Sequence, residues 1–391
     1  MNSTPPSHPA TVSELPHINA LDGLRGVAVS MVVLYHFWWA LPKYQHPLSA
    51  GITRVLAVFL IGQKGVDLFF VLSGFLITGI LLRTKGSANY FRTFYIRRSL
   101  RIFPLYYLTL FVCLLAGAIW HMPQYSWSAL WYYLLYLQNI VSTFWSGDVN
   151  IDGPVHFWSL AVEEHYYLFW PLAVLLLSRR ALVTLCVALI VLPVGVRAWF
   201  QHMGLGVFTF TLCRIDTLAM GSVIAVIFQD PLQRAALVKW SRMCFVPVVL
   251  LSLGSFFVLS GSQLPMLPTF KYSLFAILCS LILVMALSPG RFNPTPRIFG
   301  NSALRALGKI SYAVYVFHPF VLLWVSRRLY DSPATPLYNR FYPAALVELA
   351  IYLVLTVLVA RVSWLVFEQP ILKLKDRFRY RLTGGSAPLP S

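Results

Sequence analysis

Residues 21–39 read LDGLRGVAVSMVVLYHFWW, and this stretch decides the fold class. It is mostly apolar, as long as a helix that spans a lipid bilayer, and it ends in two tryptophans, which are typical of a membrane interface. Two ionisable residues, Arg25 and His36, interrupt it. Eleven residues of helix make about three turns, so both side chains lie on one face, about 16 Å apart along the axis. A charge inside the bilayer costs about 2.5–3.5 kcal/mol on insertion scales, so each side chain needs a partner, a water-filled cavity or a function.

The composition of the whole chain is that of a membrane protein. Of its 391 residues, 58% are hydrophobic and 11% are charged, whereas about 25% are charged in an average globular protein. This excludes a cytosolic enzyme, a secreted disulfide scaffold and a disordered chain. The net charge of +18 is divided among short segments between apolar runs, which favours the cytoplasmic face of a membrane over nucleic-acid binding.

Apolar runs recur along the sequence with short polar segments between them. There are eleven runs, at 19–41, 56–82, 102–120, 127–144, 156–178, 181–200, 207–229, 244–261, 269–288, 308–326 and 342–367. The basic segment 83–101 and the basic tail predict that both termini are cytoplasmic, which requires an even number of crossings. The run at 127–144 is therefore expected to be re-entrant or interfacial. We predict an all-α polytopic membrane helix bundle of about ten transmembrane helices, with eleven as the alternative.

One membrane domain is expected over residues 18–370, in the inner cell membrane. Residues 1–17 lack the basic start of a signal peptide, and we expect them to form a disordered cytoplasmic N-terminus. Residues 371–391 are expected to form a cytoplasmic tail that is first basic and then disordered. The first span, by the same topology, has Arg25 near the cytoplasmic end and His36 in the outer half.

A carboxylate interrupts the run HFWSLAVEEHYYLFWP at residues 156–171. Glu163 lies seven residues after His156 on the same helix face, and Tyr167 lies one turn further on. A carboxylate paired with an imidazole is the usual way to orient a general base. An interhelical ion pair is an equal alternative for Glu163.

Further polar residues indicate a polar interior. Arg214 and Asp216 are two residues apart and cannot face each other on a helix, so each needs a partner on another span. Tyr315 and His318 fall on one stripe of their span, where a structural role for the histidine is a strong alternative. No pair of ligands has HExxH-type spacing, so no metal site is expected.

Three arginines stand close together in YIRRSLRIFPLYY at residues 95–107. Arg97, Arg98 and Arg101 repel one another unless an anion joins them, and guanidinium groups suit bidentate phosphate contacts. Ordinary positive-inside charge is the alternative. Lys64 opens the second span and is a further candidate for the same anion. In that span Ser73 is interpreted as a small packing residue rather than as a nucleophile.

Seven strings occur together and in order: LDGLRGVAV with Arg25-x10-His36, GVDLFFVLSGFLIT, RRSLRIFPLYY, HFWSLAVEEHYYLFWP, CRIDTLAMG, SYAVYVFHP and FEQP. In this combination the chain resembles the membrane-bound acyltransferase family 3 from about Ala20 to Pro370. Members of this family O-acetylate surface polysaccharides, lipid-linked sugars and some secondary metabolites. The resemblance implies functional roles for Arg25, His36, Glu163 and His318, and for the three clustered arginines. Some relatives carry an additional hydrolase-like domain, which is not expected in the short sequence after Pro370.

The resemblance implies an O-acetyltransferase. It would use acetyl-CoA as co-substrate, bind no permanent cofactor, and act on a hydroxyl of a saccharide or lipid-linked sugar. Arg97, Arg98, Arg101 and Lys64 would bind the phosphates, and the pantetheine arm would pass Arg25 toward His36. His36, oriented or charge-balanced by Glu163, would act as general base or carry the acyl group itself. Supporting roles are expected for His318, Arg214, Asp216, Tyr315 and Tyr167. Acceptor identity, acyl length and oligomeric state are left open.

Two other functions fit the same residues. Intramembrane charges also mark the substrate path of a transporter, here for a sugar-containing or amphiphilic substrate. The second alternative is a non-enzymatic scaffold in glycan assembly, in which His36 and Glu163 would have no function.

Overall fold

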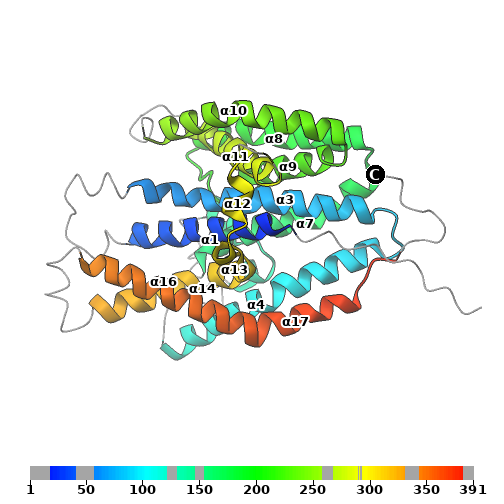
Figure 1. Cartoon of the computed structure of the whole chain (residues 1–391). Coiled ribbons are helices and arrows are strands. Elements are labelled where there is room, and N and C mark those ends of the chain that lie inside the picture. Colours follow the sequence, from blue (N-terminus) through cyan, green and yellow to red (C-terminus); the bar gives the residue numbers. More distant parts are fainter. Residues whose placement is uncertain are drawn as a thin grey trace, which may run out of the picture.

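The computed structural model describes residues 18–40, 57–120, 130–145, 154–257, 267–288, 290, 293–330 and 343–381. Helices make up nearly all of these ranges, which confirms the predicted all-α bundle. The long helices run side by side along one direction (Figure 1). They are α1 (Asn19–Ala40), α3 (Gly65–Thr84), α4 (Tyr90–Trp120), α7 (Trp158–Leu176), α8 (Arg179–His202), α9 (Thr211–Ile227), α10 (Pro231–Phe257), α11 (Leu267–Ala286), α14 (Ser311–Tyr330) and α16 (Pro343–Ser363).

Seven of the described helices are long and apolar enough to cross a membrane, or eight if the bent pair α13 (Ser302–Lys309) and α14 forms one span. Two further helices run within the bundle: α9, which has 17 residues, and α7, which carries two glutamates. Both pack against α3. A multi-pass membrane protein is therefore shown, and the count of ten crossings stays a prediction.

The described part of the run at 127–144, from residue 130 onward, contains only short helices. These are α5 (Leu130–Leu134) and α6 (Gln138–Phe144), separated by Tyr136 with a positive φ of 58°. The hydroxyls of Tyr106 and Tyr107 on α4 donate to the carbonyls of Tyr133 and Leu134, at 2.8 and 3.1 Å. Neither helix is long enough to cross a bilayer. This agrees with the expectation of a re-entrant or interfacial segment.

The basic connections meet at one end of the bundle. Lys85 donates to the carbonyl of Leu177 at the end of α7, at 2.9 Å. Arg179 at the start of α8 lies 3.6 Å from Asp230, which precedes α10. Near the C-terminus, the Arg381 carbonyl accepts from the Ala88 amide. Most of the basic segments are thus on one side, as the topology predicts, and the identity of that side stays a prediction.

Three predicted boundaries were wrong. The expected loop 83–101 is helical from Tyr90 onward, because no proline or glycine occurs between Tyr90 and Pro104. The last span extends beyond residue 367 through η6 (Trp364–Glu368), α17 (Gln369–Lys373) and η7 (Leu374–Arg377). The span predicted at 308–326 begins at Ser311 as α14, because a 76° bend separates it from α13.

The bend brings α13 onto α1 at backbone contact distance. A Cβ added to Gly26 would lie 2.2 Å from the Leu304 carbonyl oxygen, and one added to Gly308 would lie 1.8 Å from that of Asp22. Only glycine permits this approach. The crossing of α13 fixes α1 beside α14, and so fixes the helix that carries Arg25 and His36.

Candidate active site

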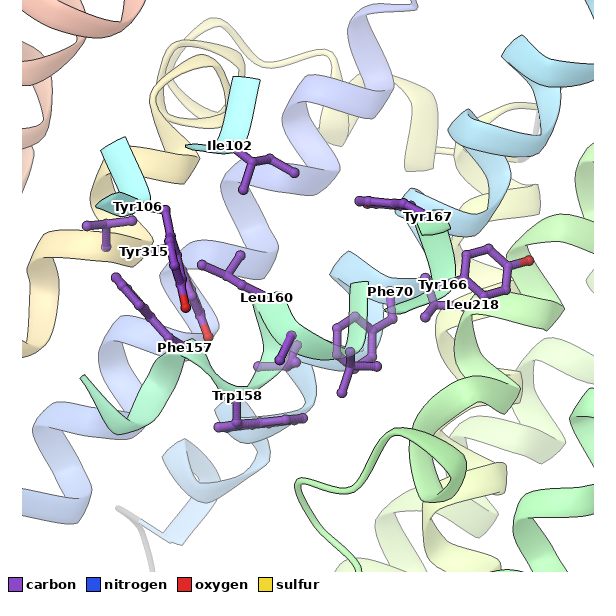
Figure 2. Close-up of a cluster of buried hydrophobic side chains, with 14 of the residues drawn as sticks. Phe70, Ile102, Tyr106, Phe157, Trp158, Leu160, Tyr166, Tyr167, Leu218 and Tyr315 are labelled. Atoms are coloured by element: carbon purple, nitrogen blue, oxygen red, sulfur yellow. The ribbon is translucent and has the colours of Figure 1, made fainter. Parts of the chain in front are cut away.

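A pocket lies between α1, α3, α4, α7 and α14, and we call it the arginine pocket. Its polar lining residues are Arg25, Ser73, Arg98, Arg101, Ser159, Glu163, Tyr167, Ser311, Tyr312 and Tyr315. Figure 2 labels several residues that line this pocket: Ile102 on α4, Leu160 and Tyr167 on α7, and Tyr315 on α14. A second, wider pocket shares Arg25, Arg98 and Arg101 and adds Arg97, Lys373 and Lys375. This basic vestibule continues into the arginine pocket.

The arginine pocket has more guanidinium groups than carboxylates that pair with them. Arg98 donates to the Tyr167 hydroxyl at 3.2 Å and stacks 4.5 Å from its ring centroid, and its buried Nε has no hydrogen-bond partner. Neither Arg98 nor Arg101 forms an ion pair with a carboxylate in the described part of the chain. Within the described ranges, the ion-pair partner of Arg25 is its helix neighbour Asp22, at 3.4 Å. The pocket therefore has an excess of positive charge, which suits an anionic ligand.

Glu163 rather than Glu164 lines the arginine pocket, as the resemblance implies. Its carboxylate accepts a hydrogen bond from the hydroxyl of Ser73 on α3. This pair was missed from the sequence, where Ser73 is interpreted as a packing residue. Gly74, the residue after Ser73, does serve close packing, since a Cβ added to it would lie 1.9 Å from the Leu218 carbonyl oxygen on α9.

Three histidines form a cluster away from Glu163. His36 Nδ1 lies 3.2 Å from His318 Nε2 and 2.9 Å from the Val32 carbonyl oxygen. The ring of His156 is 5.6 Å from that of His318. The structure thus brings His36 and His318 together. It shows no direct pair between His36 and Glu163, and the expectation that this carboxylate orients the histidine or balances its charge stays a prediction.

Hydrogen-bond partners assign the tautomers of the cluster. His318 Nδ1 lies 2.7 Å from the carbonyl oxygen of Tyr315, which can only accept, so this nitrogen carries the proton. His318 Nε2 is then an acceptor and takes a hydrogen bond from His36 Nδ1–H. The remaining lone pair of His36 is on Nε2. A neutral imidazole with one fixed N–H and one free lone pair is suited to act as a base.

Tyr315 separates the arginine pocket from the histidine cluster. Its hydroxyl is hydrogen bonded to Ser159 Oγ and to the carbonyl of His156, and its ring lies 5.8 Å from that of His318. His36 does not line the pocket. The expected continuous channel from Arg25 to His36 is therefore closed at this point in the structure.

Lys64, Arg214 and Asp216 belong to a different cluster, which we call the paired network, together with Asp67 and Arg197. Arg214 pairs with Asp67, Lys64 lies 3.6 Å from the same carboxylate, and Arg197 lies 2.9 Å from Asp216. Arg214 and Asp216 thus find partners on other helices, as their spacing predicts. The structure places Lys64 here rather than with Arg97, Arg98 and Arg101, because Asp67 one turn along α3 binds its ammonium group.

No metal-binding group of three or more His, Cys, Asp or Glu side chains occurs in the described ranges. The chemistry available at the site is that of bases, hydroxyls and guanidiniums. Such groups suit the transfer of an acyl group from an anionic donor to a hydroxyl.

Comparison with known proteins agrees with this chemistry. Residues 18–367 match the family described as the acyltransferase domain. The relatives include the O-acetyltransferases OatA of Staphylococcus aureus strains NCTC 8325 and COL, each 26% identical over 91% of this chain. The chain spans 57% of the length of these relatives. No solved structure matches. The match over nearly the whole chain shows that this protein belongs to the membrane-bound acyltransferase family 3.

Proposed function

We propose that this protein transfers an acetyl or other short acyl group from cytoplasmic acyl-CoA to a hydroxyl of a saccharide or glycolipid. The observation that carries the proposal is the arginine pocket, whose guanidiniums lack matching carboxylates and which continues into a basic vestibule. The relatives named O-acetyltransferase support the acetyl group and the oxygen acceptor. The inner cell membrane, with both chain ends in the cytoplasm, is part of the proposal.

The donor would enter from the basic vestibule. Its phosphates would meet Arg97, Arg98 and Arg101, and Lys373 and Lys375 line the same vestibule. Arg97 already donates to the Phe378 carbonyl at 3.1 Å, so it would join as a partly engaged side chain. The thioester would extend into the arginine pocket, where Arg25 and Tyr167 face it. Charge-assisted hydrogen bonds to phosphate are about twice as strong as neutral ones.

The acceptor would react on the side of the histidine cluster. His36 would take the proton of the acceptor hydroxyl at Nε2, while His318 fixes its ring through Nδ1. General base catalysis of this kind contributes about 10²–10⁴ in rate. The hydrogen bond between Tyr315 and Ser159 has to open for acyl group and acceptor to meet, because it closes the pocket on this side. An acyl-imidazole on His36 is the alternative route.

The test uses purified protein in lipid nanodiscs with labelled acetyl-CoA and a lipid-linked sugar fraction. We expect H36A to lose at least a hundredfold in acetyl transfer while it still binds acetyl-CoA and stays folded. H202A is the matched control, since His202 is exposed at the end of α8, outside both pockets. Full transfer by H36A would overturn the role of His36. Sugar movement across the bilayer without consumption of acetyl-CoA would indicate a transporter instead.

A further inference from the structure

Ser73 differs from most hydroxyl side chains in this bundle. Ser30, Ser280 and Thr109 donate to the carbonyl four residues earlier in their own helix, which is the usual local partner of a helical hydroxyl. Ser73 instead donates across to the carboxylate of Glu163 on α7, 90 residues away in sequence. Both residues line the arginine pocket. A hydroxyl whose proton points at a carboxylate, in a pocket wall, has the arrangement of an activated nucleophile.

A second serine–glutamate pair forms the same kind of hydrogen bond but lines neither pocket, so it serves as a comparison. Ser326 on α14 donates to Glu348 on α16 at 2.9 Å, and both residues are buried. Neither lines the arginine pocket or the basic vestibule. This pair therefore serves helix packing. Ser73 and Glu163 have the same hydrogen bond, but they have it beside the guanidiniums of Arg25 and Arg98.

The surroundings of Ser73 supply the other groups that acyl transfer to a hydroxyl needs. Arg98 donates to Tyr167, and both line the pocket with Ser73. A guanidinium and a phenol in a pocket wall can stabilise the negative charge that develops on a carbonyl oxygen under attack. The vestibule behind them is where the anionic part of the donor would bind.

We propose that Ser73 is the residue that first accepts the acyl group, as a serine ester, and that Glu163 is its general base. This deepens the proposed function and rests on it, since it takes acyl-CoA as the donor. Ser73 Oγ attacks the thioester carbonyl and forms an O–C bond while its proton passes to Glu163. The C–S bond breaks, and the CoA thiolate leaves and takes a proton from water.

The second step releases the ester. The acceptor hydroxyl attacks the ester carbonyl and gives its proton to His36, which later loses it to water. The bond between Ser73 Oγ and the acyl carbon breaks, and Glu163 returns its proton to Oγ. The sum is one acyl group moved from sulfur to the acceptor oxygen, with no oxidant or further reactant.

The test follows the first step without any acceptor. Purified protein in nanodiscs is mixed with labelled acetyl-CoA and quenched in acid, and free CoA thiol and the mass of the Ser73 peptide are measured. We expect a burst of about one CoA per protein and one acetyl group on Ser73. S73A should show no burst, and E163Q should slow it by about a hundredfold or more. S326A, the matched control, should keep the full burst.

Two results separate this inference from the proposed function. If the parent protein binds and consumes no acyl-CoA even with acceptor, the proposed function itself fails. If S73A transfers acetyl at the parent rate, or if the acetyl group is found on His36, the inference is overturned while the proposed function stands. S73C guards against a folding defect, because it should form a thioester that neutral hydroxylamine cleaves, whereas the serine ester resists it.

Discussion

Two groups of arginines lie inside this helix bundle, one buried and one half-buried, and they differ in what neutralises them. In the paired network, Arg197 and Arg214 each contact a carboxylate on another helix. In the arginine pocket, Arg98 has the Tyr167 hydroxyl as its partner, and Arg101 has no ion-pair partner among the described residues. A charge already paired inside the protein stabilises the helices that share it. A charge left unpaired beside an open pocket is available for a ligand.

The paired network should respond to mutation through stability. Arg214→Met removes the guanidinium from Asp67, which is fully buried. Breaking a buried pair by removing one partner costs up to about 3–5 kcal/mol when the other charge is left unpaired. Lys64, 3.6 Å from Asp67, offsets part of that cost in R214M. We expect a large drop in the thermal unfolding temperature in detergent and a low yield of folded protein. The double variant R214M/D67N should recover part of the loss, and an unchanged unfolding temperature for R214M would remove the contrast between the two groups.

The arginine pocket should respond through ligand affinity instead. We expect R98A/R101A to unfold at or above the temperature of the parent, because mutual repulsion is relieved. Its affinity for acetyl-CoA should fall about a hundredfold, since each charge-assisted hydrogen bond contributes about 1.5–3 kcal/mol. Calorimetric titration measures this.

Two control variants sharpen that experiment. R361A removes an exposed arginine of α16 outside both pockets and should bind acetyl-CoA as the parent does. R98K/R101K should restore only part of the affinity, because an ammonium group lacks the bidentate geometry. Unchanged binding by R98A/R101A would mean that these arginines only set membrane topology.

The sequence predicts which residues lie on which helix far better than it predicts their partners. Bilayer thickness and the period of 3.6 residues place Arg25, Arg98, Glu163 and Tyr167 on inward faces, and the structure brings them to one pocket. Partner choice depends on how distant helices pack. His36 and His318 are 282 residues apart, and no local sequence pattern predicts their contact.

Competition between neighbours explains the sites that sequence reasoning missed. Lys64 was expected beside the clustered arginines because it is basic, but Asp67 one turn away binds it first. The bend between α13 and α14 brings α13 against the backbone of α1, and apolar periodicity does not record such a contact. Glycines at 26 and 308 were the available signal, and they become informative only when the two helices are known to meet.

The histidine cluster is a third polar region, and it should respond through rate rather than stability or affinity. His318→Gln keeps a polar side chain but removes the imidazole that accepts from His36 Nδ1. We expect the turnover rate to fall roughly tenfold to a hundredfold, less than the full 10²–10⁴ of the base itself. The affinity for acetyl-CoA should stay within twofold of the parent. A loss of affinity equal to that of R98A/R101A would place His318 in the donor site and merge two regions that the structure separates.

An exposed ion pair between an arginine and a carboxylate should give the smallest stabilisation in this comparison. Asp230 precedes α10 and lies 3.6 Å from Arg179. A hydrogen bond from the Gln233 amide, with smaller contributions from the Leu232 amide and Arg179, lowers the pKa of Asp230. A carboxyl group whose pKa is lower in the folded state stabilises the fold above its unfolded pKa of about 3.9, and this contribution is lost as the pH falls through the folded value.

Asp230→Asn isolates that contribution, because the amide oxygen still caps the helix while the charge is gone. At pH 7 the variant should unfold slightly below the parent, by much less than R214M, since exposed pairs contribute little. The difference should shrink as the pH falls below 4, because the protonated aspartic acid and the asparagine then carry the same charge. Unfolding curves of both proteins between pH 7 and pH 3 measure it. A difference that grows toward low pH would mean that the Asp230 carboxylate does not stabilise the fold. The contrast between paired and unpaired arginines would then not hold for the exposed pair of Arg179 and Asp230.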